Sequence, residues 1–384
     1  MLPSRAPTLL GPNIFVGPDL FNPPPQQGWL TIAPTFTLSG DYNDNVGQRS
    51  SNKESDFSFG FTPGITASVQ RRGFTLLAGY DVSGRVSVQD SSLNDFGKHQ
   101  HFFADMAYDI APGLTFTLRD EFVRDDNSNA VSTAGESVGA RDSFRNTLIP
   151  RLRWQATRST GFALAGSYSL QRFSDLNRDT DTYRLRLEGD HRFTERLTGI
   201  AEVGGAYLNF EDESPAHTYT FRPGLSYAVT PTLQVRVRAG PSFVYHRGEQ
   251  DVRPSVSAWL LQIFKYGSLQ VGYDRAVTAQ ALGLTDVDSF YAAIVVPTLV
   301  RGLQFSFTPR YSILNRDVAV SSGEETQRVT TLTLNLRATY DLGRNFSLVG
   351  SYNFFRQTDD RGTGDIDQNR VFFGVQYAFP INFY

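Results

Sequence analysis

The sequence predicts an all-β protein, a single up-and-down antiparallel transmembrane β-barrel of about eighteen strands. Three observations predict it. Apolar residues alternate with polar ones through most segments of the chain, which is the two-residue period of a strand with one apolar face. Short turns alternate with longer polar loops, as in barrels whose turns lie on one side of the membrane. The chain ends in an apolar strand, which would leave an exposed sheet edge unless it pairs with the first strand.

The composition agrees with a β-rich chain and excludes several protein classes. The 384 residues include 30 Phe, 17 Tyr and 33 Gly but only 2 Met, a mixture rich in strand-forming aromatics. The net charge of −3, from 36 basic and 39 acidic residues, argues against a nucleic-acid-binding protein. Cysteine is absent, so the chain has no disulfide framework and no thiolate metal site. A mean hydropathy of −0.30 excludes a helical membrane bundle, whereas a barrel carries its apolar band on alternate residues.

The chain divides into residues 1–27 and residues 28–384. The first part contains Pro3, Pro7, Pro12 and Pro18, and we expect an irregular, proline-rich segment on the periplasmic side. A secretory signal, with its basic stretch and apolar core, is not visible there, so we expect that signal to have been removed. Residues 28–384 form the predicted barrel.

The predicted strands follow one another in a regular rhythm. The first is expected over residues 29–42 and the second over 57–69, and a tight turn at Arg71-Arg72-Gly73 leads to the third over 74–88. Further short turns are expected at residues 112–113, 157–160, 194–196, 230–232, 265–267, 299–302 and 342–345, and longer loops at 89–98, 126–140, 175–179, 211–215, 247–250, 282–286, 317–325 and 358–366. About eighteen strands is an even number, which places both termini on the periplasmic side. A barrel of this size is wide enough for an aqueous lumen.

Two soluble all-β architectures are less consistent with the pattern. A β-sandwich of this length would divide into domains joined by a linker, and no such break is visible. A propeller would repeat a motif in each blade, and none stands out. The membrane barrel is therefore the favoured fold.

Arginines occupy many positions that alternation assigns to the lumen. They alternate with apolar residues such as Leu185, Leu187, Val235 and Val237, which are assigned to the lipid side. The favoured interpretation is that these arginines pair with lumenal carboxylates as part of the wall. The alternative is a charged track for an anionic or sugar-rich solute, because the guanidinium fork binds carboxylate or phosphate in two places. The candidate pore-lining residues are Arg119, Arg151, Arg153, Arg184, Arg186, Glu188, Arg222, Arg236, Arg238, Arg310 and Arg337.

The last strand resembles the C-terminal signal that outer-membrane barrels present to their assembly machinery. A glycine followed by aromatics two residues apart is present as Gly374, Tyr377 and Phe379, and the chain ends on the aromatic Tyr384. The sequence departs from that pattern at Phe372, where a polar residue is usual, and in the five residues that follow Phe379.

Signs of catalysis or of a bound cofactor are weak. The sequence contains neither a Gly-x-Ser-x-Gly elbow nor a His-Glu-x-x-His motif, so we expect no enzyme activity and no cofactor. His99 and His101, at the start of a strand, are expected to be solvated rather than to bind a metal. The acidic residues 359–367 are likewise expected to form a solvated loop rather than a calcium site. No metal is therefore predicted.

Three stretches resemble the putative β-barrel porin 2 family of bacterial outer-membrane proteins. They are Asp41-Tyr42-Asn43-Asp44-Asn45-Val46, residues 55–65 with Thr62-Pro63-Gly64, and residues 103–122 with the Pro112-Gly113 turn. The resemblance implies a location in the outer membrane and a conduit for secretion of an exopolysaccharide. It also implies as partners outer-membrane lipid and lipopolysaccharide, the barrel assembly machinery and periplasmic polysaccharide-export proteins.

Two other functions stay open from the residues alone. One is a general diffusion porin for small solutes, and the other is a plugged structural or docking barrel in an envelope complex. The loop at residues 126–140 bears on this choice, because it is long enough to fold inward and constrict the lumen. The sequence does not decide whether it does.

Overall fold

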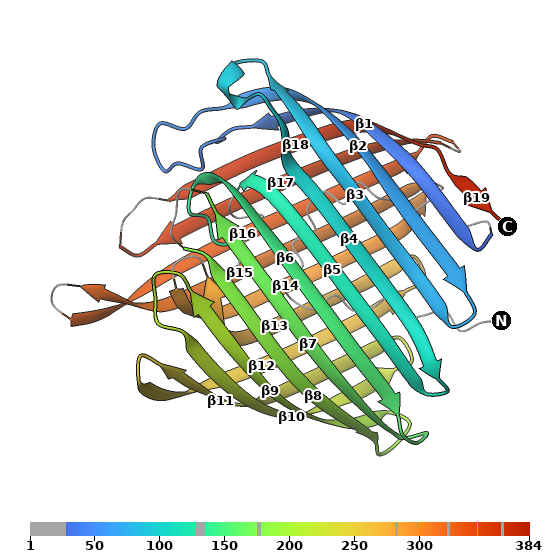
Figure 1. The fold of residues 1–384 in the computed structure, drawn as a ribbon, viewed down its shortest axis with the longest axis vertical. Coiled ribbons are helices and arrows are strands. Elements are labelled where there is room, and N and C mark those ends of the chain that lie inside the picture. Colours follow the sequence, from blue (N-terminus) through green and yellow to red (C-terminus); the bar gives the residue numbers. More distant parts are fainter. Residues whose placement is uncertain are drawn as a thin grey trace.

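The protein folds as one closed antiparallel barrel (Figure 1). The computed structural model describes residues 28–127, 135–174, 178–280, 283–300, 302–320, 323–343, 345–361 and 365–384. Within these ranges the only helix is η1 (Ser91–Leu93), a single 3-10 turn. No helix in the described part of the chain is long and apolar enough to cross a membrane.

Eighteen long strands and one short one make up the described sheet, and each of the long strands is hydrogen-bonded to its sequence neighbours. The strands are β1 (Leu30–Asn43), β2 (Asp56–Arg71), β3 (Phe74–Ser87), β4 (Asp95–Ala111), β5 (Leu114–Asn127), β6 (Ala140–Gln155), β7 (Thr160–Phe173), β8 (Thr180–Arg192), β9 (Leu197–Phe210), β10 (Ala216–Thr230), β11 (Leu233–His246), β12 (Glu249–Phe264), β13 (Gly267–Gln280), β14 (Gly283–Val300), β15 (Leu303–Val320), β16 (Gly323–Asp341), β17 (Phe346–Asp359), β18 (Ile366–Ala378) and β19 (Ile381–Phe383).

The last strands close the sheet onto the first. β18 pairs antiparallel with β1, so that Tyr377 lies opposite Phe36. After an interruption at Phe379 and Pro380, β19 resumes the same ladder, with Phe383 opposite Leu30. The predicted fold class, an up-and-down barrel of about eighteen strands whose apolar last strand has no free edge, is confirmed.

Turns and loops gather at opposite ends of the barrel. The turns β2–β3 and β4–β5 lie at the right-hand end of Figure 1 with the C-terminus, and the loops β1–β2 and β3–β4 lie at the left. Two of the turns are tight because Gly73 and Gly113 adopt positive φ angles of 74° and 80°, which favour glycine. Bacterial membrane barrels place short turns in the periplasm, so we refer to the loop end as the outer mouth.

The two faces of the wall differ as the alternation predicts. Leu38 and Leu185 on the outer face are 58% and 59% exposed, although they are large and apolar. Small polar residues such as Thr37 and Ser58 occupy the opposite face and are buried. A continuous apolar band around a closed sheet requires hydrocarbon rather than water as its solvent. The protein is therefore a bacterial outer-membrane β-barrel, as the sequence predicted.

Candidate pore lining

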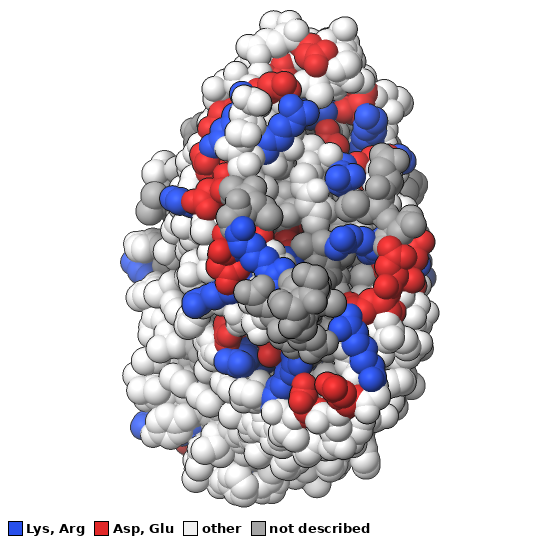
Figure 2. Space-filling model, turned by 90° about the vertical axis from the view of Figure 1, so that its left-hand side faces the viewer, with Lys and Arg blue, Asp and Glu red and all other residues white. Residues whose placement is uncertain are grey.

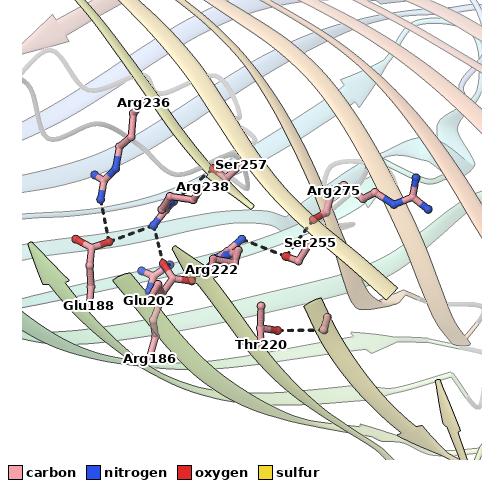
Figure 3. Close-up of polar contacts among 11 residues, drawn as sticks. Arg186, Glu188, Glu202, Thr220, Arg222, Arg236, Arg238, Ser255, Ser257 and Arg275 are labelled. Carbon is pink, nitrogen blue, oxygen red and sulfur yellow. Dashed lines mark hydrogen bonds and ion pairs between the residues drawn. The ribbon is translucent and has the colours of Figure 1, made fainter. Parts of the chain in front are cut away.

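Arginines and glutamates from neighbouring strands form a polar network on the inner face (Figure 3). Arg238 on β11 donates to Glu188 on β8 at 3.1 Å and to Glu202 on β9 at 2.6 Å. Arg236 donates to Glu188 at 3.0 Å, and Arg222 on β10 donates to Glu202 at 3.0 Å. Side chains from strands three apart converge only on the concave face of a curved sheet, so this face is the lumen.

Two further arginines complete the network at longer distances. Arg151 on β6 lies 3.8 Å from Glu188, and Arg186 on β8 lies 3.8 Å from Glu202. We call the set Arg151, Arg186, Arg222, Arg236 and Arg238 the arginine wall. Its five guanidiniums face two carboxylates, which leaves three positive charges within the network. The pairing that the sequence favoured is present, and it does not neutralise the wall.

The wall is unevenly hydrated. Glu202 lies deepest, with its side chain only 3% exposed, because three arginines surround it. The side chains of Arg151 and Arg186 are 43% and 44% exposed, although they point into the barrel. Exposure on an inward face means that water reaches these guanidiniums inside the lumen.

The remaining predicted lining residues lie beside or away from this network. Arg153 pairs with Asp190, and Arg119 lies 3.8 Å from Asp105. Arg184 donates to Thr278 on β13 at 3.1 Å. Glu188 is one of the two carboxylates that the arginine wall contacts. Arg310 and Arg337 lie on β15 and β16, outside the wall. A role of these residues in conduction stays a prediction.

Contacts across the interior narrow the lumen on the β8–β14 side. The bond between Arg184 and Thr278 joins β8 to β13, which are five strands apart. Towards the outer mouth of the same strands lies a buried apolar cluster; its members are Leu208, Phe210, Ala216, Val244, Ala279 and Leu284. This part of the barrel is filled by its own side chains.

The end of the β5–β6 loop reaches into the barrel at the outer mouth. We call residues 135–139 the inner loop segment. Glu136 accepts a hydrogen bond at 2.7 Å from Arg316 on β15, and both side chains are almost fully buried. The backbone N–H of Ser137 donates to Gln357 on β17 at 2.8 Å, and the Ser137 and Gln48 side chains lie 2.5 Å apart. The loop therefore crosses from β5 and β6 to the facing wall, a point that the sequence left open.

Charged side chains of both signs crowd this mouth (Figure 2). A cavity of about 460 Å³ opens there, and its lining includes Gln48, Arg85, Asp126 and Arg141. The sequence singled out the β5–β6 loop but not Glu136, Arg316 or Gln357. The sequence offers one local indication that Arg316 faces inward: it lies an even number of residues from Arg310 on β15, so the two side chains share a face.

The expectation that His99 is solvated is wrong. Its side chain is 13% exposed and lies among Asp95, Asp125 and Asp126. His101 lies 3.6 Å from Asp81 and is also mostly enclosed. The β3–β4 loop folds back over the start of β4, because a register shift between Ser83 and Gly84 brings Asp95 opposite Arg85. A bulge of this kind leaves no trace in the alternation pattern.

The predicted assembly-signal residues lie on the closing strand and just beyond it. Gly374 is buried on the inner face, where a Cβ would lie 3.1 Å from the Leu38 carbonyl oxygen. Tyr377 and Phe379 point outward, and the Tyr377 ring lies 4.9 Å from that of Phe346. Tyr384, at the end of the chain, is 87% exposed. Their part in assembly stays a prediction, as do the proposed lipid and protein partners. The predicted N-terminal segment, residues 1–27, lies outside the described residues.

Comparisons with known proteins give one partial family match. The family described as "Putative MetA-pathway of phenol degradation" matches residues 137–244, from the end of the β5–β6 loop to β11. No curated protein matches the sequence. This family differs from the putative β-barrel porin 2 family, which three stretches of the sequence resemble. The match offers no support for export of an exopolysaccharide.

The solved structures that are similar to this chain share little sequence identity with it. OccAB4 of Acinetobacter baumannii is 14% identical with a TM-score of 0.46, and the similarity covers 94% of this chain and 100% of that one. OpdQ of Pseudomonas aeruginosa is 12% identical with a TM-score of 0.45, covering 91% and 98% of the two chains. OccK5 (OpdH) of the same species is 14% identical with a TM-score of 0.45, covering 92% and 100%.

Proposed function

We propose that the barrel is a passive diffusion pore for small polar solutes with a preference for anions. The observation that carries the proposal is the hydrated arginine wall. Arg151 and Arg186 are each more than 40% exposed inside the barrel, and the wall holds three more guanidiniums than carboxylates. A water-filled lumen with fixed positive charge on one side concentrates anions and repels cations. No catalytic step belongs to this function.

Small solutes suit the interior better than a polymer does. The inner loop segment crosses the outer mouth and is fixed to Arg316 and Gln357 on the facing wall. The contact between Arg184 and Thr278 narrows the lumen further along. An exopolysaccharide conduit, which the family resemblance implies, would need these contacts to open for every chain that passes. A plugged docking barrel is the competing proposal, and it differs in predicting no ion conductance.

The charge reversal Arg151→Glu with Arg186→Glu tests the proposal. These two residues are chosen because their guanidiniums are the more hydrated ones and make only 3.8 Å contacts to carboxylates, so the barrel should still assemble. In planar bilayers under a salt gradient, the wild-type barrel should give an anion-selective reversal potential. The double variant should shift that potential towards cation selectivity.

The control is Arg356→Glu, which makes the same type of substitution at a single exposed position outside the arginine wall. Arg356 pairs with Asp365 at 3.0 Å, and both side chains are about half exposed. This control should leave selectivity as it is in the wild type. Absence of conductance in the wild-type barrel would favour the plugged alternative, and conductance without any shift in the double variant would remove the arginine wall from the conduction path.

A further inference from the structure

A second polar cluster lies at the outer mouth, on strands that the arginine wall does not use. His99 on β4 points its Nε2 atom at two carboxylates, 3.6 Å from Asp95 Oδ2 and 3.7 Å from Asp126 Oδ1. Its other ring nitrogen, Nδ1, lies 3.4 Å from Asp125 Oδ2. Arg85 on β3 donates to Asp126 at 2.7 Å and lies 3.1 Å from Asp95.

The polar atoms that point at the centre of this cluster lack hydrogen bonds. The side chain of Asp95 is 2% exposed, and neither of its carboxylate oxygens accepts a hydrogen bond. The Nε2 atom of His99 is also buried without a hydrogen-bonding partner. Burying a carboxylate in this way is costly unless a cation compensates for it. The contact with Arg85 meets part of this need, because the same guanidinium also serves Asp126.

We propose that Asp95, His99 and Asp126 bind one divalent transition-metal ion of the Zn²⁺ type. The three donor atoms lie within 4.8 Å of one another. In a tetrahedral site with bonds of about 2.1 Å, neighbouring ligand atoms lie about 3.4 Å apart. The 3.6 and 3.7 Å separations around His99 Nε2 match this spacing, so an ion enters with small side-chain adjustments. One imidazole and two carboxylates leave the fourth position for water.

Asp125 serves as a positioning residue for this site. A histidine that binds a metal through one ring nitrogen usually donates the other N–H to a carboxylate, which fixes the ring and its tautomer. Asp125 occupies that place beside His99 Nδ1. Arg85 orients the carboxylates of Asp95 and Asp126 from the opposite side.

The site is open to the medium outside the barrel. The cavity of about 460 Å³ at the outer mouth is lined by Asp126, one of the proposed ligands, and by Arg85, which contacts two of them. An ion can therefore reach the cluster without passing through the lumen. A bound ion would connect β4 with the end of β5 at the start of the β5–β6 loop.

The proposal is tested by titrating Zn²⁺ into chelator-treated, folded barrel in detergent and measuring the heat of binding. The wild-type protein should bind one ion per chain. His99→Gln and Asp95→Asn should each weaken binding by at least about tenfold, because each removes a ligand. Asp125→Asn should weaken it by about 10–100-fold, as expected for a residue that orients a ligand.

The matched control is His246→Gln, which removes another mouth histidine that lies 3.4 Å from a carboxylate, that of Glu213. Its affinity for Zn²⁺ should equal that of the wild type. Heat-modifiable migration on a gel shows which variants are folded. If one of the ligand variants does not fold, Asp126→Asn, which removes the ligand at the end of β5, is measured in its place. Lack of stoichiometric binding by the folded wild type, or equal binding by folded His99→Gln, would overturn the proposal.

Discussion

The ion pair between Glu136 and Arg316 is the residue-scale contact that holds the inner loop segment in the mouth. Both side chains are at most 3% exposed, and Arg316 also donates to Gln327 at 2.9 Å. Breaking a buried pair by removing one partner typically costs about 3–5 kcal/mol, whereas an exposed pair contributes about 0–1 kcal/mol. This pair therefore contributes strongly to the position of the loop, together with the hydrogen bonds of Ser137 to Gln357 and Gln48.

We predict that Glu136→Ala releases the inner loop segment and raises the single-channel conductance. The barrel itself should remain assembled, because the loop is not part of the hydrogen-bonded ladder. The control is Asp365→Asn, which breaks the exposed pair with Arg356 and should leave conductance unchanged. Equal conductance in Glu136→Ala and wild type would mean that this segment does not constrict the path.

At the scale of the element, β8 shows how one strand faces lipid on one side and the polar interior of the barrel on the other. Tyr183, Leu185 and Leu187 are each about half exposed on the outer face. Arg184 and Glu188 point inward to Thr278 and to the arginine wall. A shift of one residue in register would exchange the two sets, so lipid and lumen together specify the pairing of this strand.

The register of β8 predicts opposite outcomes for two neighbouring substitutions. Leu185→Arg should impair assembly, because a charge on the lipid face costs about 2–4 kcal/mol near the membrane midplane. Arg184→Gln should assemble normally, because its position faces the interior, where a polar side chain is tolerated. The yield of heat-modifiable barrel in outer membranes measures both. Normal assembly of Leu185→Arg together with failure of Arg184→Gln would show that the facing is inverted.

At the scale of the whole molecule, net charge and pore charge differ in sign. The chain carries a net charge of −3, yet the arginine wall is positive. Selectivity in such a pore comes from the charges that line the path rather than from the total. It should therefore depend on the distance over which salt lets those charges act.

We predict that the anion preference is strong at low salt and weak at high salt. The screening length is about 10 Å at 0.1 M and about 3 Å at 1 M, so solutes at the centre of the lumen lose contact with the wall. Reversal potentials measured at a fixed concentration ratio and increasing total salt should converge on the non-selective value. A preference that stays constant up to 1 M would indicate direct binding at the arginines instead of a diffuse field.

The inward facing of the arginines was predictable from the chain because facing is a local property. The alternation of Arg184 and Arg186 with Leu185 and Leu187 marks the two sides of β8 without knowledge of any other strand. Arg236 and Arg238 on β11 were assigned in the same way. Glu188 on β8, their common partner, was also predicted to line the lumen. The sequence did not show that Glu188 connects β8 to β11.

The sequence by itself determined the barrel, its approximate strand number, the sidedness of its turns and the inward arginines, since each follows from a period of two residues or from the spacing of turns. Only the tertiary structure decided which side chains meet. The inner loop segment contacts β15 and β17, and the three carboxylates surround His99, because of barrel curvature, stagger and a bulge between β3 and β4. These contacts depend on how all the strands pair to close the barrel, and the residue pattern of a single strand carries no information about them.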